Sequence, residues 1–366
     1  MNILFFFTHP SKYHLFRNTI NTLVKLGHNV EVLHTSKDVL DELVNHEKWR
    51  HKNIFPKGRK IKWLPNKVGI SFNFLRSLYR ANKYIRGKKY DLFITDDILT
   101  IIGKIKKIPV IFFQDDDIKV VPDTFILLAT TDYVLSPECT DFGKYNSKKI
   151  GIKGFKQSSY LHPNNFIIDW DIIHQYIPKN RKYALIRLVS LTAHHDGGKK
   201  GLSNEDVLKL INKLELKYCV FISSERELPQ YLEKYRLKDS TLDMIHILGG
   251  AEIFISDSQT MSAEAALLGT PYIRFNDFVG RINCLEKLEK KYQLGSGIRL
   301  KNKEMLFEKI DEFMQYEDIR ENWKIKRDFM ISETVDLEKF MIWLFSHFPK
   351  SIEILKENPD YQKIFV

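Results

Sequence analysis

The sequence of 366 residues contains little cysteine and no long apolar run. Its three cysteines, Cys139, Cys219 and Cys284, are odd in number, widely spaced and without a C-x-x-C pair, which argues against a disulfide framework and a structural zinc site. No apolar stretch approaches the roughly 18 residues of a membrane-spanning helix. Residues 1–10 lack the basic region and the small-residue cleavage site of a signal peptide. These absences predict a cytoplasmic protein.

Glycine, proline and serine form no low-complexity tract, and 43% of the residues are hydrophobic while 28% are charged. This composition is typical of a folded globular chain. Because 366 residues exceed what one hydrophobic core usually serves, we expect two domains of about 150 to 200 residues.

Acidic residues are absent from residues 48–90, which contain 14 lysines and arginines among eight aromatic residues. Residues 1–150 carry 25 basic and 15 acidic residues, so they account for +10 of the net charge of +11. A basic, aromatic segment predicts an anionic partner, either an anionic membrane surface or a nucleic acid. A solvated basic face explains the same composition. We expect the core to bury some residues of this segment, Phe72 and Leu75 before the others.

Short apolar runs alternate with stretches of helical periodicity. The expected strands are residues 2–7, 29–33, 91–95, 109–113, 133–136, 183–189, 218–223, 252–255 and 272–275. Strands separated by helices predict parallel sheets that are covered on both faces. We therefore predict an α/β fold of two doubly wound, Rossmann-like domains that face a cleft. Residues 303–348 have helical periodicity, and we expect the last of these helices to pack back on the first domain.

Four segments follow from this pattern. They are a first domain at 1–150, an interdomain hinge at 151–181, a second domain at 182–330 and a C-terminal helix and tail at 331–366. Ligands of open parallel sheets bind where the strands end, so the loops after the strands are the candidate binding elements.

In the first domain, His9, Lys12 and His14 follow the first strand, Asp96 follows a middle strand and Asp115 follows the next. A histidine or an aspartate at this edge can act as a general base toward a hydroxyl group. We assign that catalytic role to His14 or Asp96, and a place in the acceptor site or cleft to His9, Lys12 and Asp115. His14 can instead belong to a helix start.

In the second domain, the most informative loop is residues 256–260, which opens a helix of small residues. Ser258, Gln259 and Thr260 lie at the start of this helix, where unpaired backbone N–H groups bind phosphate. Glu264 follows on the second turn, where its carboxylate can accept hydrogen bonds from a ribose diol. A capped helix with Glu264 in a structural ion pair explains the spacing equally well.

The loop after the first strand of the second domain offers His194, His195 and Lys199. Cations or imidazoles there would stabilise a diphosphate leaving group without a metal. We assign this catalytic role to His194 or His195, and the alternative is a solvated turn in which the histidines pair only with Asp196. Further residues expected to bind the nucleotide donor are Arg187, Lys199 and Ser224.

Two further features have open interpretations. Adjacent carboxylates at Asp115, Asp116 and Asp117 suit a hard cation, but the run lies outside the domain with the phosphate-binding pattern, so we expect no metal. We interpret Asp116 and Asp117 as a solvated turn. Lys156, in the hinge, either reaches into the cleft toward a phosphate or carboxylate or is an exposed lysine.

Residues 257–265, with the pattern Asp-Ser-x-x-x-x-x-Glu-Ala, precede Leu-Gly-Thr-Pro at 268–271 and Arg274. This segment resembles the nucleotide-binding segment of the non-hydrolysing UDP-N-acetylglucosamine 2-epimerases and, more loosely, of many GT-B glycosyltransferases. Residues 192–195 resemble the epimerases' Thr-x-His-Arg segment, with His195 in place of the arginine. The early Gly-x-Arg-Pro-Glu motif of the epimerases is absent.

Nearly the whole chain is similar to a bacterial and archaeal GT-B-like family that is labelled a domain of unknown function. The segments that carry this resemblance are 9–10, 14–16, 154–156, 160–161, 193–196, 222–225, 260–271 and 278–281. The resemblance implies a GT-B fold and a nucleotide sugar, in particular a uridine diphosphate sugar, as the donor substrate.

We predict a metal-independent glycosyltransferase that moves a sugar from a donor in the second domain to a surface-polysaccharide or glycolipid acceptor in the first. It needs no cofactor, and its basic first domain fits a peripheral location at the inner membrane face. The alternatives are a sugar 2-epimerase or nucleotide-sugar hydrolase on the same fold, or a nucleic-acid-binding protein that uses residues 48–90. Because nucleic-acid binding leaves residues 256–274 unexplained, we expect no nucleic-acid partner.

Overall fold

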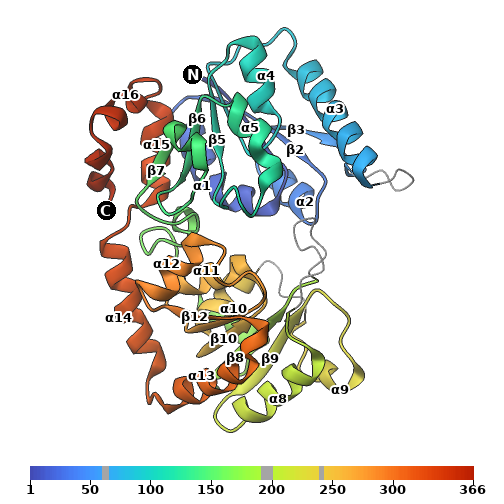
Figure 1. Cartoon of the computed structure of the whole chain (residues 1–366), viewed down its shortest axis with the longest axis vertical. Coiled ribbons are helices and arrows are strands. Elements are labelled where there is room, and N and C mark those ends of the chain that lie inside the picture. Colours follow the sequence, from blue (N-terminus) through green and yellow to red (C-terminus); the bar gives the residue numbers. More distant parts are fainter. Residues whose placement is uncertain (60–65, 191–200, 239–242) are drawn as a thin grey trace. The chain divides into compact units, whose positions relative to one another are not determined.

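The computed structural model describes residues 1–59, 66–190, 201–238 and 243–366. The chain divides into two compact units, one formed by Met1–Tyr160 with Val335–Val366 and the other by Leu161–Thr334. Each unit is built on a parallel β-sheet with helices packed on it (Figure 1). The predicted α/β class with two doubly wound domains is therefore confirmed.

The sheet of the first unit has seven strands in the order β3-β2-β1-β4-β5-β6-β7, and every neighbouring pair is parallel. Its strands are β1 (Asn2–Phe7), β2 (Asn29–Thr35), β3 (Arg50–Phe55), β4 (Leu92–Thr95), β5 (Val110–Phe113), β6 (Tyr133–Pro137) and β7 (Lys149–Ile152). The strand order reverses between β1 and β4. The loops that leave these two strands therefore diverge and open a crevice at their carboxyl ends.

Both faces of this sheet are covered by helices. Ile3, Phe5 and Phe7 of β1 point to one face and pack with α1 (Pro10–Lys25) and α15 (Leu337–Ser346). Leu4 and Phe6 point to the other face, because side chains alternate along a strand, and pack with α3 (Asn66–Ile85) and α4 (Leu99–Lys106).

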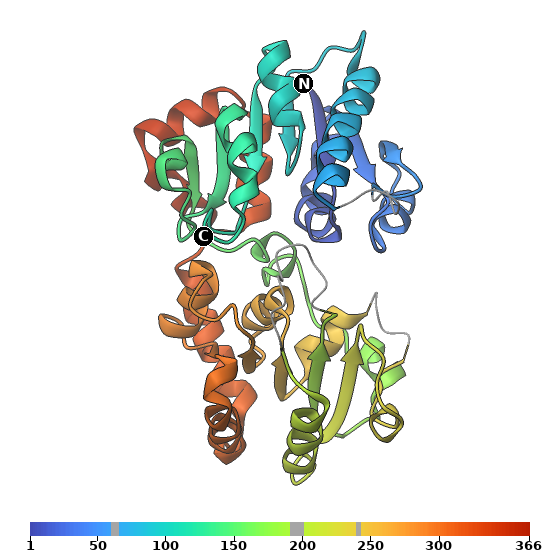
Figure 2. The same ribbon diagram turned by 45° about the vertical axis from the view of Figure 1, so that its right-hand side comes forward.

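The last residues of the chain belong to the first unit (Figure 2). There α15 contacts α1. Val335 N donates a 2.8 Å hydrogen bond to Lys153 O, and Gln362 Nε2 donates a 2.9 Å bond to Gly151 O beside the edge strand β7. The prediction that the C-terminal helices pack back on the first domain is confirmed. The other helices of this unit are α2 (Leu40–Asn45), α5 (Phe125–Thr130) and α16 (Lys350–Glu357), and the short helix α6 (Ser158–Leu161) ends where the second unit begins.

The sheet of the second unit has five parallel strands in the order β12-β11-β10-β8-β9. They are β8 (Tyr183–Leu188), β9 (Cys219–Ser224), β10 (Ile253–Ser256), β11 (Tyr272–Phe275) and β12 (Gly295–Ile298). Its helices are α7 (Trp170–Tyr176), α8 (Asn204–Leu214), α9 (Gln230–Glu233), α10 (Met244–Gly250), α11 (Gln259–Leu268), α12 (Asn283–Lys290), α13 (Lys303–Gln315) and α14 (Ile319–Ser332). Here the order reverses between β8 and β10, so the crevice lies at the carboxyl ends of these two strands.

The strands that the sequence pattern missed, β3, β7 and β12, all lie at the edge of a sheet. An edge strand has one neighbour and is less covered, so its residues need not form an apolar run. The sequence of β3, Arg-His-Lys-Asn-Ile-Phe, has only two buried residues, and β12 reads Gly-Ser-Gly-Ile. Low hydrophobicity therefore concealed these three strands.

Helix α3 corrects a second expectation. Phe72 and Leu75, which we expected to be buried, are 48% and 62% exposed. The helix instead buries Ser77, Ala81 and Ile85 against the sheet. In the parts of the chain that the structure describes, no helix combines the length and hydrophobicity needed to cross a bilayer.

Candidate functional site

The turn between β10 and α11 lies at the crevice of the second unit. Ser258 is the N-cap residue of α11, and its Oγ accepts a 3.3 Å hydrogen bond from Met261 N. Its own backbone N–H donates a 2.7 Å bond to Ser256 Oγ. Gln259 and Thr260 form the first turn, where Thr260 is exposed. Because the first N–H groups of a helix have no intrahelical acceptor, this turn can bind an anion.

Asp257 connects the two strands that flank the crevice. Its side chain is buried, and Oδ1 accepts a 2.8 Å hydrogen bond from Val189 N, directly after β8. Among the described residues Oδ2 has no hydrogen-bond donor, and the Arg226 guanidinium lies 4.0 Å away. Burial raises the pKa of Asp257 to about 6. A side chain at Gly201 would overlap Oδ2, so only glycine fits against this carboxyl group.

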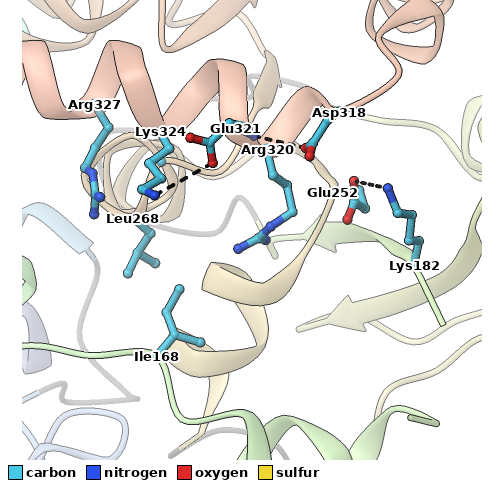
Figure 3. Close-up of a pocket in the computed structure, with 10 residues that line it drawn as sticks. Ile168, Lys182, Glu252, Leu268, Asp318, Arg320, Glu321, Lys324 and Arg327 are labelled. Atoms are coloured by element: carbon cyan, nitrogen blue, oxygen red, sulfur yellow. Dashed lines mark hydrogen bonds and ion pairs between the residues drawn. The ribbon is translucent and has the colours of Figure 1, made fainter. Parts of the chain in front are cut away.

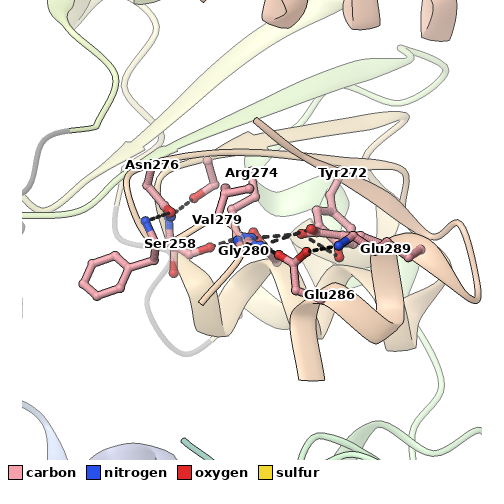
Figure 4. A network of polar contacts seen from close by, with 12 residues as sticks. Ser258, Tyr272, Arg274, Asn276, Val279, Gly280, Glu286 and Glu289 are labelled. Carbon is pink, nitrogen blue, oxygen red and sulfur yellow. Dashed lines mark hydrogen bonds and ion pairs between the residues drawn. The ribbon is translucent and has the colours of Figure 1, made fainter. Parts of the chain in front are cut away.

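Asn276 fastens the end of β11 to the same turn (Figure 4). Its Nδ2 donates a 2.9 Å hydrogen bond to Asp257 O, and its Oδ1 accepts a 2.9 Å bond from Phe278 N. The side chain is fully buried. Asp257 and Asn276 thus tie the loops after β8, β10 and β11 into one rigid edge. Sequence reasoning gave neither residue a role, although a polar residue directly after a buried strand is a signal that can be recognised.

Arg274 is fully buried and forms a two-point ion pair with Glu289 of α12 (Figure 4). Nε and the terminal nitrogen lie 2.9 and 3.1 Å from the two carboxylate oxygens. Glu286, one turn earlier, accepts a 2.7 Å hydrogen bond from Gly280 N. Gly297 makes room for the pair, because a Cβ there would overlap the carboxylate of Glu289. This network holds the loop after β11 against α12.

The other residues predicted to bind a donor have defined places. Arg187, at the end of β8, donates a 2.6 Å hydrogen bond to Ser223 Oγ and forms an ion pair with Glu225. The hydroxyl of Ser224 donates a 2.7 Å bond to Arg226 O and so closes the turn after β9. The predicted residues that lie outside the described part of the chain are His194, His195 and Lys199.

Glu264 lies on the second turn of α11 and is 7% exposed. Ala263, Ala265 and Ala266 surround it in the sequence and are buried as well. Their small side chains allow α11 to lie close to the sheet. The structure therefore brings Ser258, Arg187 and Ser224 to one edge of the second sheet, with Glu264 one turn further along α11.

In the first unit, the crevice contains a compact ionic cluster. Asp115 lies between two lysines, with Lys12 Nζ 3.1 Å from one carboxylate oxygen and Lys156 Nζ 2.6 Å from the other. Both lysines are buried, and Lys12 also lies over the ring of Phe113. Burial alone would raise the pKa of Asp115, but the two ammonium groups lower it well below its usual range. The interpretation of Lys156 as an exposed lysine is wrong.

Asp96 lies beside this cluster at the end of β4. Thr8 Oγ1 approaches one carboxylate oxygen at 3.4 Å, and in the described part of the chain the other has no hydrogen-bond donor. Burial raises the pKa of Asp96 to about 6, although Lys12 opposes this shift.

The two histidines predicted at this edge lie on α1 and at its start. Burial lowers the pKa of His14 to about 4, and its ring lies 5.7 Å from that of Tyr160. His9 is the N-cap residue of α1, where its Nδ1 accepts a bond from Ser11 N.

The acidic run after β5 does not form a solvated turn throughout. Asp117 is buried, and its Oδ1 accepts a 2.6 Å hydrogen bond from Asp141 N. The expectation of a solvated Asp117 is therefore wrong, because this carboxylate fastens the loop at residue 141. Gln114 Oε1 shapes the start of the same loop by accepting bonds from the backbone N–H groups of Asp115 and Asp116.

The second unit also contains a cavity of about 430 Å³, away from the crevice described above (Figure 3). Arg320, Lys324 and Arg327 extend into it from α14. Lys182 and Glu252 also line it, and they directly precede β8 and β10. The cavity thus lies at the amino ends of the strands, opposite the loops that form the crevice, and we assign it no ligand.

No protein-family model and no curated protein sequence matches the chain. Solved structures do match its fold. UDP-GlcNAc 2-epimerase from Neisseria meningitidis, bound to UDP-GlcNAc, matches with a TM-score of 0.64 and 13% identity over 98% of this chain and 100% of that chain.

Two further matches have the same identity of 13% and a TM-score of 0.58. MurG from Acinetobacter baumannii covers 94% of this chain and 99% of its own, and the UDP-GlcNAc 2-epimerase of Methanocaldococcus jannaschii, in complex with UDP-GlcNAc and UDP, covers 90% and 98%. Likeness at this low identity speaks for the fold alone. The chain has the GT-B fold that the sequence resemblance implied.

Proposed function

We propose that the protein is a metal-independent GT-B glycosyltransferase, with a uridine diphosphate sugar as donor and a polysaccharide or glycolipid hydroxyl as acceptor. The observation that carries this proposal is the turn of Asp257 and Ser258, which opens α11 at the point where the strand order of the second sheet reverses. Ligands of open α/β sheets bind at such a point. The two epimerases with the same fold are described with UDP-GlcNAc bound, which supports this donor class.

The donor's diphosphate is proposed to lie against the first turn of α11, where the N–H groups of Gln259 and Thr260 and the positive end of the helix dipole favour negative charge. Because the hydroxyl of Ser258 already caps the helix, we assign phosphate binding chiefly to the backbone of this turn. Glu264 is the proposed partner of the ribose diol. We assign stabilisation of the leaving diphosphate to His194 or His195, because this loop follows the first strand of the second domain in the sequence.

The acceptor hydroxyl is proposed to lose its proton to Asp96. A general base works best when its pKa lies near the working pH, and a pKa of about 6 leaves Asp96 ionised but still basic at pH 7. His14, with a pKa of about 4, is the weaker base. In the transfer, the acceptor oxygen forms a bond to the anomeric carbon, the bond from that carbon to the phosphate oxygen breaks, and the proton passes to Asp96. Lys12, Asp115 and Lys156 form the charged wall beside it.

The test of the donor site is the melting temperature of the protein across a panel of nucleotides and nucleotide sugars. We expect selective stabilisation by uridine diphosphate and its sugars, because a ligand that binds only the folded state raises its stability. Glu264→Gln should weaken this binding about tenfold, since a hydrogen bond to a charged group contributes roughly 1.5 to 3 kcal/mol. Glu312→Gln, a change at a half-exposed glutamate of α13, is the matched control. Equal affinity in both variants would remove Glu264 from the site.

A 2-epimerase or hydrolase is the second candidate, because the matched structures include UDP-GlcNAc 2-epimerases. Incubation with uridine diphosphate sugars in the absence of an acceptor separates the two. A transferase leaves the donor essentially unchanged, whereas an epimerase yields the 2-epimer and a hydrolase yields the free sugar. Either product at a substantial rate would overturn the transferase proposal while leaving the donor site in place.

A further inference from the structure

The outer face of helix α3 in the first unit carries a stripe of large apolar side chains. Phe72, Leu75 and Tyr79 are 48%, 62% and 68% exposed. Their spacing of three and four residues places them on one side of the helix. The side toward the sheet is already occupied, since Ala81 and Ile85 are buried there. Packing among the described residues of the unit therefore does not account for the stripe.

Basic side chains flank this stripe. Lys83 and Arg86 are exposed and lie on the same side of α3, and Arg76 lies 5.9 Å from the ring of Phe72. Residues 48–90, which include β3 and α3, contain 14 lysines and arginines and no aspartate or glutamate. Every charged side chain of this segment is therefore positive, and the carboxylate of Glu31 in β2 lies near its C-terminal end, where it accepts bonds from Tyr84 and Lys88.

We propose that this face of α3 docks on an anionic lipid bilayer. A helix that lies in the headgroup region places apolar side chains below the phosphates and lysine or arginine at their level, which is the pattern of α3. Phe72, Leu75 and Tyr79 enter the interface, while Arg76, Lys83 and Arg86 contact the headgroups. A nucleic acid would use the positive charge but leaves the aliphatic Leu75 without a function, so the bilayer accounts for more of the face.

This docking rests on the proposed glycosyltransferase and defines its acceptor further. Arg59 connects α3 to the crevice of the first unit, with one guanidinium nitrogen 3.0 Å from Ser77 Oγ and another 2.5 Å from Asp97 Oδ2. Asp97 directly follows Asp96, the proposed general base. Arg59 thus ties the inner side of α3, opposite the docked face, to the loop that carries Asp96. We infer from this link between the docking helix and the acceptor loop that the acceptor is linked to a lipid.

The experiment is flotation of the full chain with vesicles of phosphatidylcholine alone or with added phosphatidylglycerol. We expect binding only to the anionic vesicles, with loss at high salt, because the interaction between lysine or arginine and anionic lipid is screened. Phe72→Ser with Leu75→Ser and Tyr79→Ser should abolish flotation. Lys83→Glu with Arg86→Glu should lower the affinity for anionic vesicles at least about 25-fold, since each basic residue near an anionic surface contributes about fivefold.

The matched control removes three apolar side chains that are equally exposed in the second unit, Leu216, Ile325 and Phe329. Their serine variants should float like the wild type. Equal flotation with both vesicle types, no flotation, or equal loss in the control would overturn the proposal, as would binding to an oligonucleotide instead of vesicles. Donor-induced stabilisation should be the same in every variant, so failure of the membrane proposal and failure of the donor site are distinguishable. The charge-reversed variant still gives a result if the serine variant does not fold.

Discussion

Replacing Asp257 by asparagine tests whether the edge of the second sheet contains a carboxylate that is costly to ionise. The folded protein raises the pKa of Asp257 from 3.8 to about 6, chiefly by burial. Below pH 3.8 Asp257 is protonated in both the folded and the unfolded protein, so its carboxyl group does not lower the free energy of unfolding there. As the pH rises to 6, the unfolded chain ionises more readily than the folded protein, and stability is lost. Above pH 6 the full cost, about 3 kcal/mol, is present.

Asparagine resembles the neutral acid and keeps an oxygen for the N–H of Val189, which lies 2.8 Å from Asp257 Oδ1. Asp257→Asn should therefore gain stability relative to the wild type as the pH rises. We expect a relative gain of about 1 kcal/mol at pH 4.5 and about 3 kcal/mol at pH 7.5. Any fixed effect of the amide group is the same at both pH values, so the difference of about 2 kcal/mol is the quantity to be measured.

The assay is thermal unfolding of the full chain across this pH range, with Asp171→Asn, at an exposed position of α7, as the control. For a unit of the size of Leu161–Thr334, about 2 kcal/mol corresponds to roughly 4 to 8 °C in melting temperature. Parallel pH curves for the wild type and Asp257→Asn would show that burial of this charge does not govern its titration. That result would refute the prediction that ionisation of the buried Asp257 lowers stability as the pH rises.

Three further outcomes are expected. Asp115→Asn removes the charge shared by two buried lysines and should cost about 3 to 5 kcal/mol of unfolding free energy, measured by urea denaturation. Arg274→Met should weaken donor binding by loosening the loop after β11, and a second change, Glu289→Leu, should restore stability because it removes the unpaired buried carboxylate. Transferase activity should rise with pH around 6 as Asp96 ionises, and Asp96→Asn should lose this dependence together with most of the turnover.

The central strands were predictable because each is a short apolar run that both faces of a sheet bury. β1, β4 and β10 are entirely or almost entirely buried and stand out from the polar residues around them. Local sequence also determines helix ends, as at Ser203, whose hydroxyl forms a capping box at the start of α8 with Asp206, three residues further along. The loops after these strands were then the natural candidates for ligand binding.

Other features depend on partners that are distant in the sequence. The buried ammonium group of Lys156 is paired with Asp115, 41 positions earlier in the chain. Asp257 is significant because its carboxylate meets Val189 across two neighbouring strands. No local pattern reports such pairs, so the ionic cluster of the first unit and the rigid edge of the second emerged only from the fold.

For α3, the helical periodicity of the sequence does not show which side of the helix faces the sheet. Phe72 and Leu75 were expected inside because large apolar residues usually are, whereas contact with β-strands selects Ala81 and Ile85. The sequence by itself thus determined the α/β class, the buried strands and the loops that follow them, because these depend on local hydrophobicity and turns. Only the tertiary structure decided which charges are paired and which helix face is exposed, because both depend on residues that the fold brings together.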